Sequence, residues 1–88
     1  MERITRGMLA WSRAGHDAGT LYLVYDTQGD FVYLCDGKSR GCGKPKKKNR
    51  KHIQIIRKIP CELESWNGET LRDEEIRAIL KKYKAKEV

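Results

Sequence analysis

Positive charge is concentrated in one short stretch of this 88-residue chain. Residues 38–58 contain ten of its 19 Lys and Arg residues and none of its 12 Asp and Glu residues. Lys ammonium groups bind phosphates as point charges, and Arg guanidinium groups can bind them through two parallel hydrogen bonds. This local excess predicts a surface that binds a polyanion, with RNA, DNA and other anionic surfaces as candidates. A basic loop that serves only solubility is the alternative.

Membrane lipid is a weaker candidate than nucleic acid. Residues 46–51, KKKNRK, offer no apolar side chain that could insert into a bilayer. No run approaches the ~20 apolar residues of a membrane span. The first residues, MERI, lack the apolar region of a signal peptide. The sequence therefore predicts a cytoplasmic protein that has no membrane partner.

A catalytic role finds little support in the residue pattern. His16 and Asp17 are adjacent in a glycine-rich segment, but neighbouring residues rarely face each other, and no nucleophile is placed beside them. Hydrogen bonding within the turn or to RNA is the favoured role for His16. Gly37, Gly41 and Gly43 match neither the P-loop nor the dinucleotide fingerprint. We therefore expect no enzyme activity and no small-molecule substrate.

Zinc binding can be tested against ligand spacing. Cys35, Cys42, His52 and Cys61 are spaced C-x6-C-x9-H-x8-C. Structural zinc sites normally contain C-x2-4-C pairs, which are missing from this sequence. Three cysteines do not suggest a disulfide framework either. The sequence predicts no metal ion and no other cofactor.

Five short segments separated by glycine-containing turns predict β-strands at residues 7–13, 20–26, 31–35, 39–42 and 52–57. Pro45 interrupts the lysine run and predicts an irregular basic loop between the fourth and fifth strands. Residues 20–26 are apolar on both faces, so their pattern does not say which face lies against the core. Five strands in under 60 residues predict a small curled sheet or barrel, which would remove exposed strand edges.

A helix is predicted close to the C-terminus. Thr70 is a good N-cap, and Asp73 follows three residues later, which approximates a capping box. The apolar residues recur at spacings of three and four and form one stripe, Ile76, Ile79, Leu80 and Tyr83. Such a stripe indicates a helix that packs on the sheet. We expect a barrel at residues 1–60, then a linker and packed helix at residues 61–88, in a single domain.

Several segments resemble those of a known family. Residues 7–19, GMLAWSRAGHDAG, followed by LYLV at 21–24, resemble a KOW motif. DGKSR at 36–40 and KPKKKNRKHI at 44–53 are similar to KOW proteins related to large-subunit protein fourteen of the archaeal and eukaryotic ribosome. LRDEEIRAIL at 71–80 looks like the helix of the short bacterial members of that group. This resemblance spans roughly residues 6–83. It implies an SH3-like β-barrel that binds ribosomal RNA or the ribosome, with the loop at 13–19 and the basic loop close to RNA.

Together these observations predict a mainly β protein, a small SH3-like barrel of about five strands with a C-terminal helix, that binds RNA without catalysis. The expected RNA contacts are Arg13, His16, Lys38, Arg40, Lys44, Lys46, Lys47, Lys48, Arg50 and Lys51. Lysine-rich tracts contact the phosphate backbone and carry little sequence information. Tyr25 and Tyr33 lie beside turns and are the favoured rings for stacking on bases.

The alternative function is a protein-interaction adaptor of SH3-like fold in translation or transcription. In that case the C-terminal helix would dock a partner. Ile79, Leu80 and Tyr83 would then be partly exposed in the monomer.

Overall fold

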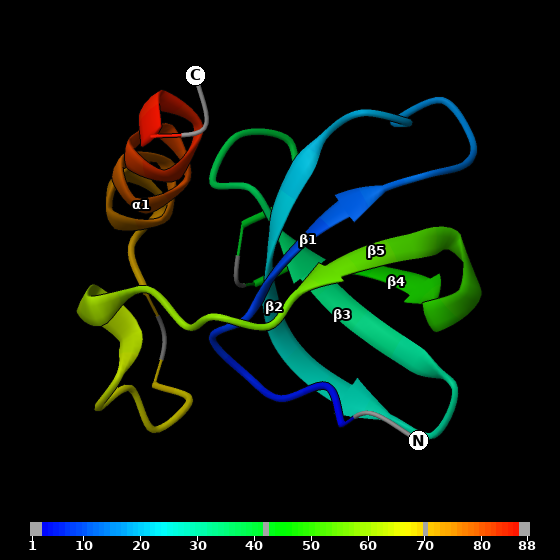
Figure 1. The fold of residues 1–88 in the computed structure, drawn as a ribbon, viewed down its shortest axis with the longest axis horizontal. Coiled ribbons are helices and arrows are strands. Elements are labelled where there is room, and N and C mark those ends of the chain that lie inside the picture. The colour runs from blue at the N-terminus through cyan, green and yellow to red at the C-terminus, as the bar shows by residue number, and fades with distance from the viewer. Residues whose placement is uncertain (1–2, 42, 70, 87–88) are drawn as a thin grey trace.

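The computed structural model describes residues 3–41, 43–69 and 71–86, and Figure 1 shows the order of its elements. Five strands come first: β1 (Leu9–Ser12), β2 (Leu21–Gln28), β3 (Phe31–Cys35), β4 (Lys46–Asn49) and β5 (Ile53–Ile56). A short 3-10 turn, η1 (Arg50–His52), joins β4 to β5. A second 3-10 turn, η2 (Cys61–Leu63), precedes the helix α1 (Asp73–Lys86).

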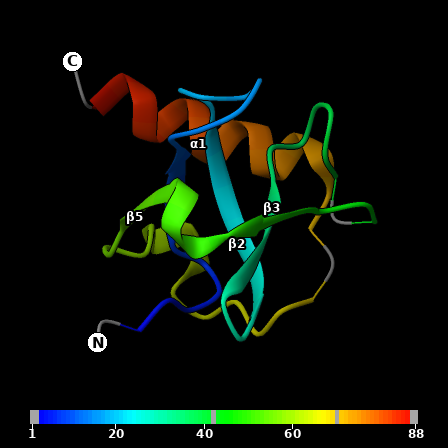
Figure 2. The same ribbon diagram turned by 90° about the vertical axis from the view of Figure 1, so that its right-hand side faces the viewer.

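The strands form one antiparallel sheet in the order β4-β3-β2-β1-β5. The first four strands are a meander, and β5 returns to pair with β1, where Ala10 lies opposite Ile55. The register of β2 against β3 shifts between Val24 and Asp26, and an irregularity of this kind bends a strand and increases its twist. The sheet is curled (Figure 2), but no ladder joins β4 to β5 within the described residues, so the barrel is open. The predicted fold class, mainly β with about five strands, a barrel-like SH3 arrangement and a C-terminal helix, is confirmed. The expected removal of exposed strand edges is wrong, because the sheet formed by these residues does not close.

Both faces of the central strand β2 are buried, which explains its continuous apolar sequence. Leu21 and Leu23 belong to a cluster that includes Ile76 of α1. Tyr22 and Val24 belong to a second cluster, which contains residues of β3 and is packed by residues of β5. The curl of the sheet visible in Figure 2 folds the face that carries this cluster inwards. The helix thus covers one face of the sheet, and the curl encloses the other.

The fourth strand lies inside the basic tract, so its prediction at residues 39–42 is wrong. Lys46–Asn49 form β4 and pair with β3, with Lys47 opposite Tyr33. The irregular loop predicted from Pro45 is also wrong for these residues. The proline immediately precedes the strand, where its missing N–H removes no ladder hydrogen bond.

The segment predicted as the fourth strand begins in a closed turn. The N–H groups of Asp36 and Gly37 donate to the carbonyl of Arg40 at 2.8 and 3.1 Å. The Asp36 carboxylate accepts the N–H groups of Lys38 and Arg40, both at 2.9 Å. These bonds use the backbone groups that a strand would need for pairing. Cys42, the last residue of the predicted strand, lies outside the described residues.

Helix α1 begins at Asp73, and its first turn is capped by Glu75, whose carboxylate accepts the N–H of Arg72 at 3.0 Å. Thr70, the predicted N-cap, lies outside the described residues. The predicted apolar stripe packs on the sheet: Ile76, Ile79 and Leu80 are buried and Tyr83 is half-buried. The expectation that the helix packs on the sheet is therefore confirmed.

The turn after β3 contacts the first half of α1. Arg77 donates a hydrogen bond from its guanidinium group to the carbonyl of Gly37. A Cβ atom at Gly37 would lie 2.5 Å from the carbonyl oxygen of Asp73, and Gly37 also has a positive φ of 75°. The turn and the helix can approach this closely only because residue 37 has no side chain.

Gly37→Ala tests this contact, and Gly29→Ala is its matched control. Gly29 also has a positive φ, 59°, but a Cβ there would meet nothing within 4 Å. Both variants should lose ~1–2 kcal/mol of unfolding free energy to backbone strain. Gly37→Ala should lose a further ~1–3 kcal/mol through overpacking against α1. Urea unfolding measures both values, and equal losses would contradict the close approach.

Candidate nucleic-acid interface

One carboxylate organises the loop between β1 and β2. Asp17 accepts hydrogen bonds from Ser12 Oγ at 2.9 Å and from Tyr22 OH at 2.7 Å. It also forms ion pairs with Lys48 Nζ at 2.6 Å and with Lys46 Nζ at 2.9 Å. Its side chain is only 14% exposed. The carboxylate therefore joins the end of β1, the start of β2 and strand β4.

Lys48 is an internal cation despite its place in the basic tract. Its side chain is 9% exposed. Besides Asp17, its ammonium group donates to Ser12 Oγ at 2.7 Å and to the carbonyl of Ala14 at 2.8 Å. A lysine ammonium has three N–H donors, and these three acceptors use all of them. All three N–H donors of Lys48 therefore bond to the loop, and none is left to bind a phosphate.

The electrostatics of Asp17 follow from these contacts. Burial disfavours the charged form and would raise its pKa, but hydrogen bonds from Lys48, Tyr22, Lys46 and Ser12 outweigh burial. The pKa of the Asp17 carboxyl therefore lies well below its usual range. Burial and the hydrogen bond to Asp17 raise the pKa of the Tyr22 hydroxyl. The Asp17 carboxyl is therefore ionised at neutral pH.

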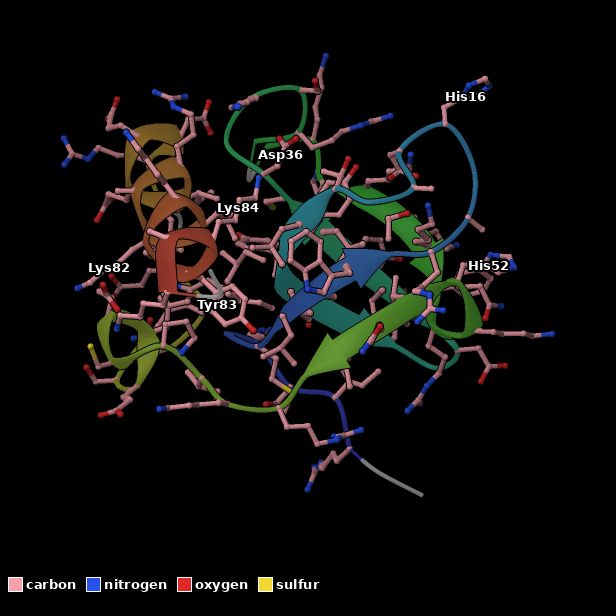
Figure 3. The ribbon with its side chains drawn as sticks, turned by 45° about the horizontal axis from the view of Figure 1, so that its top comes forward. His16, Asp36, His52, Lys82, Tyr83 and Lys84 are labelled. Atoms are coloured by element: carbon pink, nitrogen blue, oxygen red, sulfur yellow. The ribbon has the colours of Figure 1, made fainter. Side chains whose placement is uncertain are left out.

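The loop held by Asp17 presents two of the predicted RNA contacts. Backbone bonds close the loop, with Gly19 N–H donating to Ser12 O at 2.8 Å. His16 lies at its outer tip and points away from the sheet (Figure 3). Arg13 is exposed and donates to Gln54 Oε1 of β5 at 2.7 Å. A fixed loop can offer these side chains with little loss of conformational entropy on binding.

The other predicted contacts divide into exposed and internal groups. Lys38, Arg40 and Lys44 are exposed between β3 and β4. On β4, residues two apart share a face, so Lys46 and Lys48 both reach Asp17 while Lys47 points the other way and is exposed. In η1, Lys51 is exposed and Arg50 is half-buried. Of the predicted contacts, Lys46 and Lys48 are thus already paired with a carboxylate, that of Asp17.

The aromatic rings differ in exposure from the sequence-based expectation. Tyr25 is half-buried against Trp66, with ring centroids 5.8 Å apart. Tyr33 is half-buried, and its hydroxyl donates to Gln28 Oε1 at 3.0 Å. Phe31 is the large hydrophobic side chain that is exposed, at 38%, and Lys47 Nζ lies 4.5 Å from its ring centroid. Of these rings, Phe31 is the one open to solvent, next to an exposed lysine.

Sequence reasoning missed the role of Asp17. The available signal was the spacing of Lys46 and Lys48, which a strand places on one face. The spacing of these two lysines is informative only if residues 46–49 are assigned to a strand. Pro45 favoured an irregular loop there instead. The partner is 31 residues away along the chain, so no local pattern connects Lys48 to Asp17.

The described part of the chain assembles no metal site: no three His, Cys, Asp or Glu side chains gather there. Cys35 is buried in an apolar cluster and Cys61 is exposed. Among the same residues, no helix has the length and apolarity needed to cross a bilayer.

Neither of two comparisons of this chain with known proteins found a match: no family description and no curated protein matches the chain. The fold and the arrangement of charges therefore carry the functional argument.

Lys48→Ala should destabilise the fold, and Lys47→Ala is the matched control on the same strand. Removing Lys48 deprives Asp17 and Ser12 of a buried partner, and breaking a buried ion pair costs ~3–5 kcal/mol. Removing the exposed Lys47 should cost no more than ~1 kcal/mol, the value of its cation–π contact with Phe31. Chemical unfolding of both variants provides the comparison. Similar losses would show that Lys48 is not an internal cation.

Acid should weaken the fold through Asp17. A carboxyl whose pKa is lowered in the folded state stabilises that state above its unfolded pKa of ~3.9. This stabilisation is lost as the pH falls below that value towards the lower folded pKa. The unfolding free energy of the wild type should therefore decline more steeply below about pH 4 than that of Asp17→Asn. Added salt would screen exposed pairs such as Glu62–Lys82 but affect this difference less. Parallel curves for the two proteins would contradict the assignment.

Proposed function

We propose that this chain is a non-catalytic RNA-binding protein that contacts the phosphate backbone of structured RNA. The KOW resemblance makes ribosomal RNA or the ribosome the first candidate partner. The observation that carries the proposal is the Asp17 ion pair, which holds the β1–β2 loop against the basic strand β4. The pair brings this loop beside the segment 38–51, which contains β4, and the two together are called the basic edge.

Not every basic residue of this edge is exposed and free to meet phosphates. Lys46 and Lys48 hold the edge together, and the cations left to meet phosphates are Arg13, Lys38, Arg40, Lys44, Lys47 and Lys51, with His16 at the loop tip. Long-range attraction by such a group speeds encounter with a polyanion, and its contacts weaken as salt rises. The fold thus supplies a rigid support, and the exposed cations supply the affinity.

The alternative of a protein-interaction adaptor has lost its best surface. It requires the apolar stripe of α1 to be partly exposed, whereas Ile79 is 9% and Leu80 is 5% exposed. Tyr83 is half-buried against the same cluster. These residues pack on the sheet, so they do not offer a free helix face to a partner.

The proposal is tested by fluorescence anisotropy with a structured ribosomal RNA fragment and a duplex DNA across a salt series. RNA binding that survives physiological salt, with much weaker DNA binding, supports the proposal. Equal weak binding to both, lost as salt rises, would show a generic anion-binding patch instead.

Alanine at Lys44, Lys47 and Lys51 should weaken RNA binding and lower its salt dependence. Each phosphate contact contributes ~0.9 to the slope of log K against log salt on duplex nucleic acid, so the slope should fall by roughly 2–3. Since all three side chains are exposed, folding stability should change little.

The matched control replaces three other exposed lysines, Lys58, Lys82 and Lys86, with alanine. These residues line a hollow between α1 and the segment around η2, and no residue of β4 lines it. The control carries the same change in net charge at another place. If both triple variants lose affinity equally, the edge around β4 is not the RNA contact.

A further inference from the structure

A hollow lies between α1 and the loops that follow β1 and β3. Its volume is about 620 Å³, and its lining includes the buried side chains of Leu21 and Leu80. Pockets that hold drug-sized ligands measure ~300–1,000 Å³, so this hollow is large enough for part of a polymer chain to enter. Asp36 and Lys84, which both line it, are labelled in Figure 3.

The charge of this hollow is strongly positive. Four cations line it, Lys38, Arg77, Lys81 and Lys84, against one carboxylate, Asp36. That carboxylate already accepts two backbone N–H groups within its own turn. With four cations and one carboxylate, the lining keeps a formal excess of three positive charges.

The cations are placed by helix geometry. Arg77, Lys81 and Lys84 stand at i, i+4 and i+7 of α1, which puts them on one face of the helix. Arg77 also donates to the carbonyl of Gly37, which fixes the wall of the hollow. Lys81 and Lys84 are exposed, and within the described residues no carboxylate pairs with either of them. Their ammonium groups face solvent at the mouth of a built recess.

The opposite flank of α1 behaves differently. Lys82 pairs with Glu62 at 3.0 Å, and Figure 3 shows Lys82 and Lys84 on different sides of the helix. Lys82 and Lys86 line the separate hollow next to η2, which also contains Glu62 and Glu64. The helix thus separates a cationic groove from a flank where two glutamates partly offset three lysines.

We propose that the groove lined by Lys38, Arg77, Lys81 and Lys84 binds the phosphate backbone of RNA and extends the interface from β4 and the β1–β2 loop onto α1. This inference rests on the proposed RNA-binding function. The groove is continuous with that interface, because Lys38 belongs to the loop before β4, and Gly19 at the end of the β1–β2 loop also lines it. A recessed row of cations suits a phosphate chain, which can pass along the groove and meet one cation after another.

The test compares two double variants of the same helix. Lys81→Ala with Lys84→Ala removes two groove cations, and Lys82→Ala with Lys86→Ala removes two cations from the opposite flank, with the same change in net charge. Binding to the structured ribosomal RNA fragment is measured by anisotropy across a salt series. The groove variant should bind about tenfold more weakly or worse at ~0.1 M salt, with a salt slope lower by ~1–2, and the flank variant should change less than about threefold.

Three results would contradict the proposal that the groove binds RNA. Equal losses in the two double variants would mean that only net charge matters. An unchanged groove variant, together with weaker binding by the Lys44, Lys47 and Lys51 variant, would leave the proposed function in place and remove α1 from the interface. Absence of RNA binding by the wild-type protein would remove the proposed function and the groove with it.

A second measurement uses the unaltered protein. Lysines are acetylated with and without the RNA fragment, and modified sites are located by mass spectrometry. RNA should protect Lys81 and Lys84 and leave Lys82 and Lys86 reactive. Equal protection on both flanks, or protection of neither, would contradict the groove independently of any effect of mutation on folding.

Discussion

A buried ammonium group needs an acceptor for each of its N–H donors, and Lys48 meets this need through Asp17, Ser12 and Ala14. The requirement links segments that are distant in the chain. The β1–β2 loop must supply the carboxylate, and β4 must present alternate residues to it. Without Asp17, a lysine-rich segment would have little reason to lie in a sheet, since charged side chains gain nothing from burial alone. The ion pair therefore fixes both the conformation of the loop and the position of the basic strand.

The need to pair Lys48 places a lysine-rich strand at the open edge of the sheet, and this strand discourages pairing with other chains. β4 ends the sheet, and among the described residues no strand pairs with its outer side; such edges invite pairing with other chains. Its sequence, KKKN, carries the exposed Lys47, and a charged edge resists such pairing. The strand can be this polar because α1 and the curl of the sheet already bury both faces of β2. Stability resides in those two clusters, which leaves the edge available for charged contacts.

Much of the fold could be predicted from local patterns. The alternation and length of apolar runs located β3 at its observed residues and gave β1, β2 and β5 within one or two residues. The stripe at Ile76, Ile79 and Leu80 gave the packed face of α1. The fourth strand could not be found this way, because its composition is that of a loop and only the distant carboxylate of Asp17 explains it. The groove depends on how α1 docks, and the spacing of Arg77, Lys81 and Lys84 marks a helix face without saying what that face meets.

The distribution of charge also makes the molecular surface electrostatically asymmetric. Acidic residues gather between Glu62 and Glu75, and the exposed cations gather on the β4 edge and along the groove. Within α1, acidic residues fill the first turn and lysines the last, an order that the helix macrodipole favours. The same order places the basic half of the helix beside the groove. A polyanion approaching this surface is attracted by one side and repelled by the other, and complementarity of this kind sets orientation more than affinity. For the proposed RNA complex, the acidic segment would therefore limit the orientations in which the protein can lie on RNA.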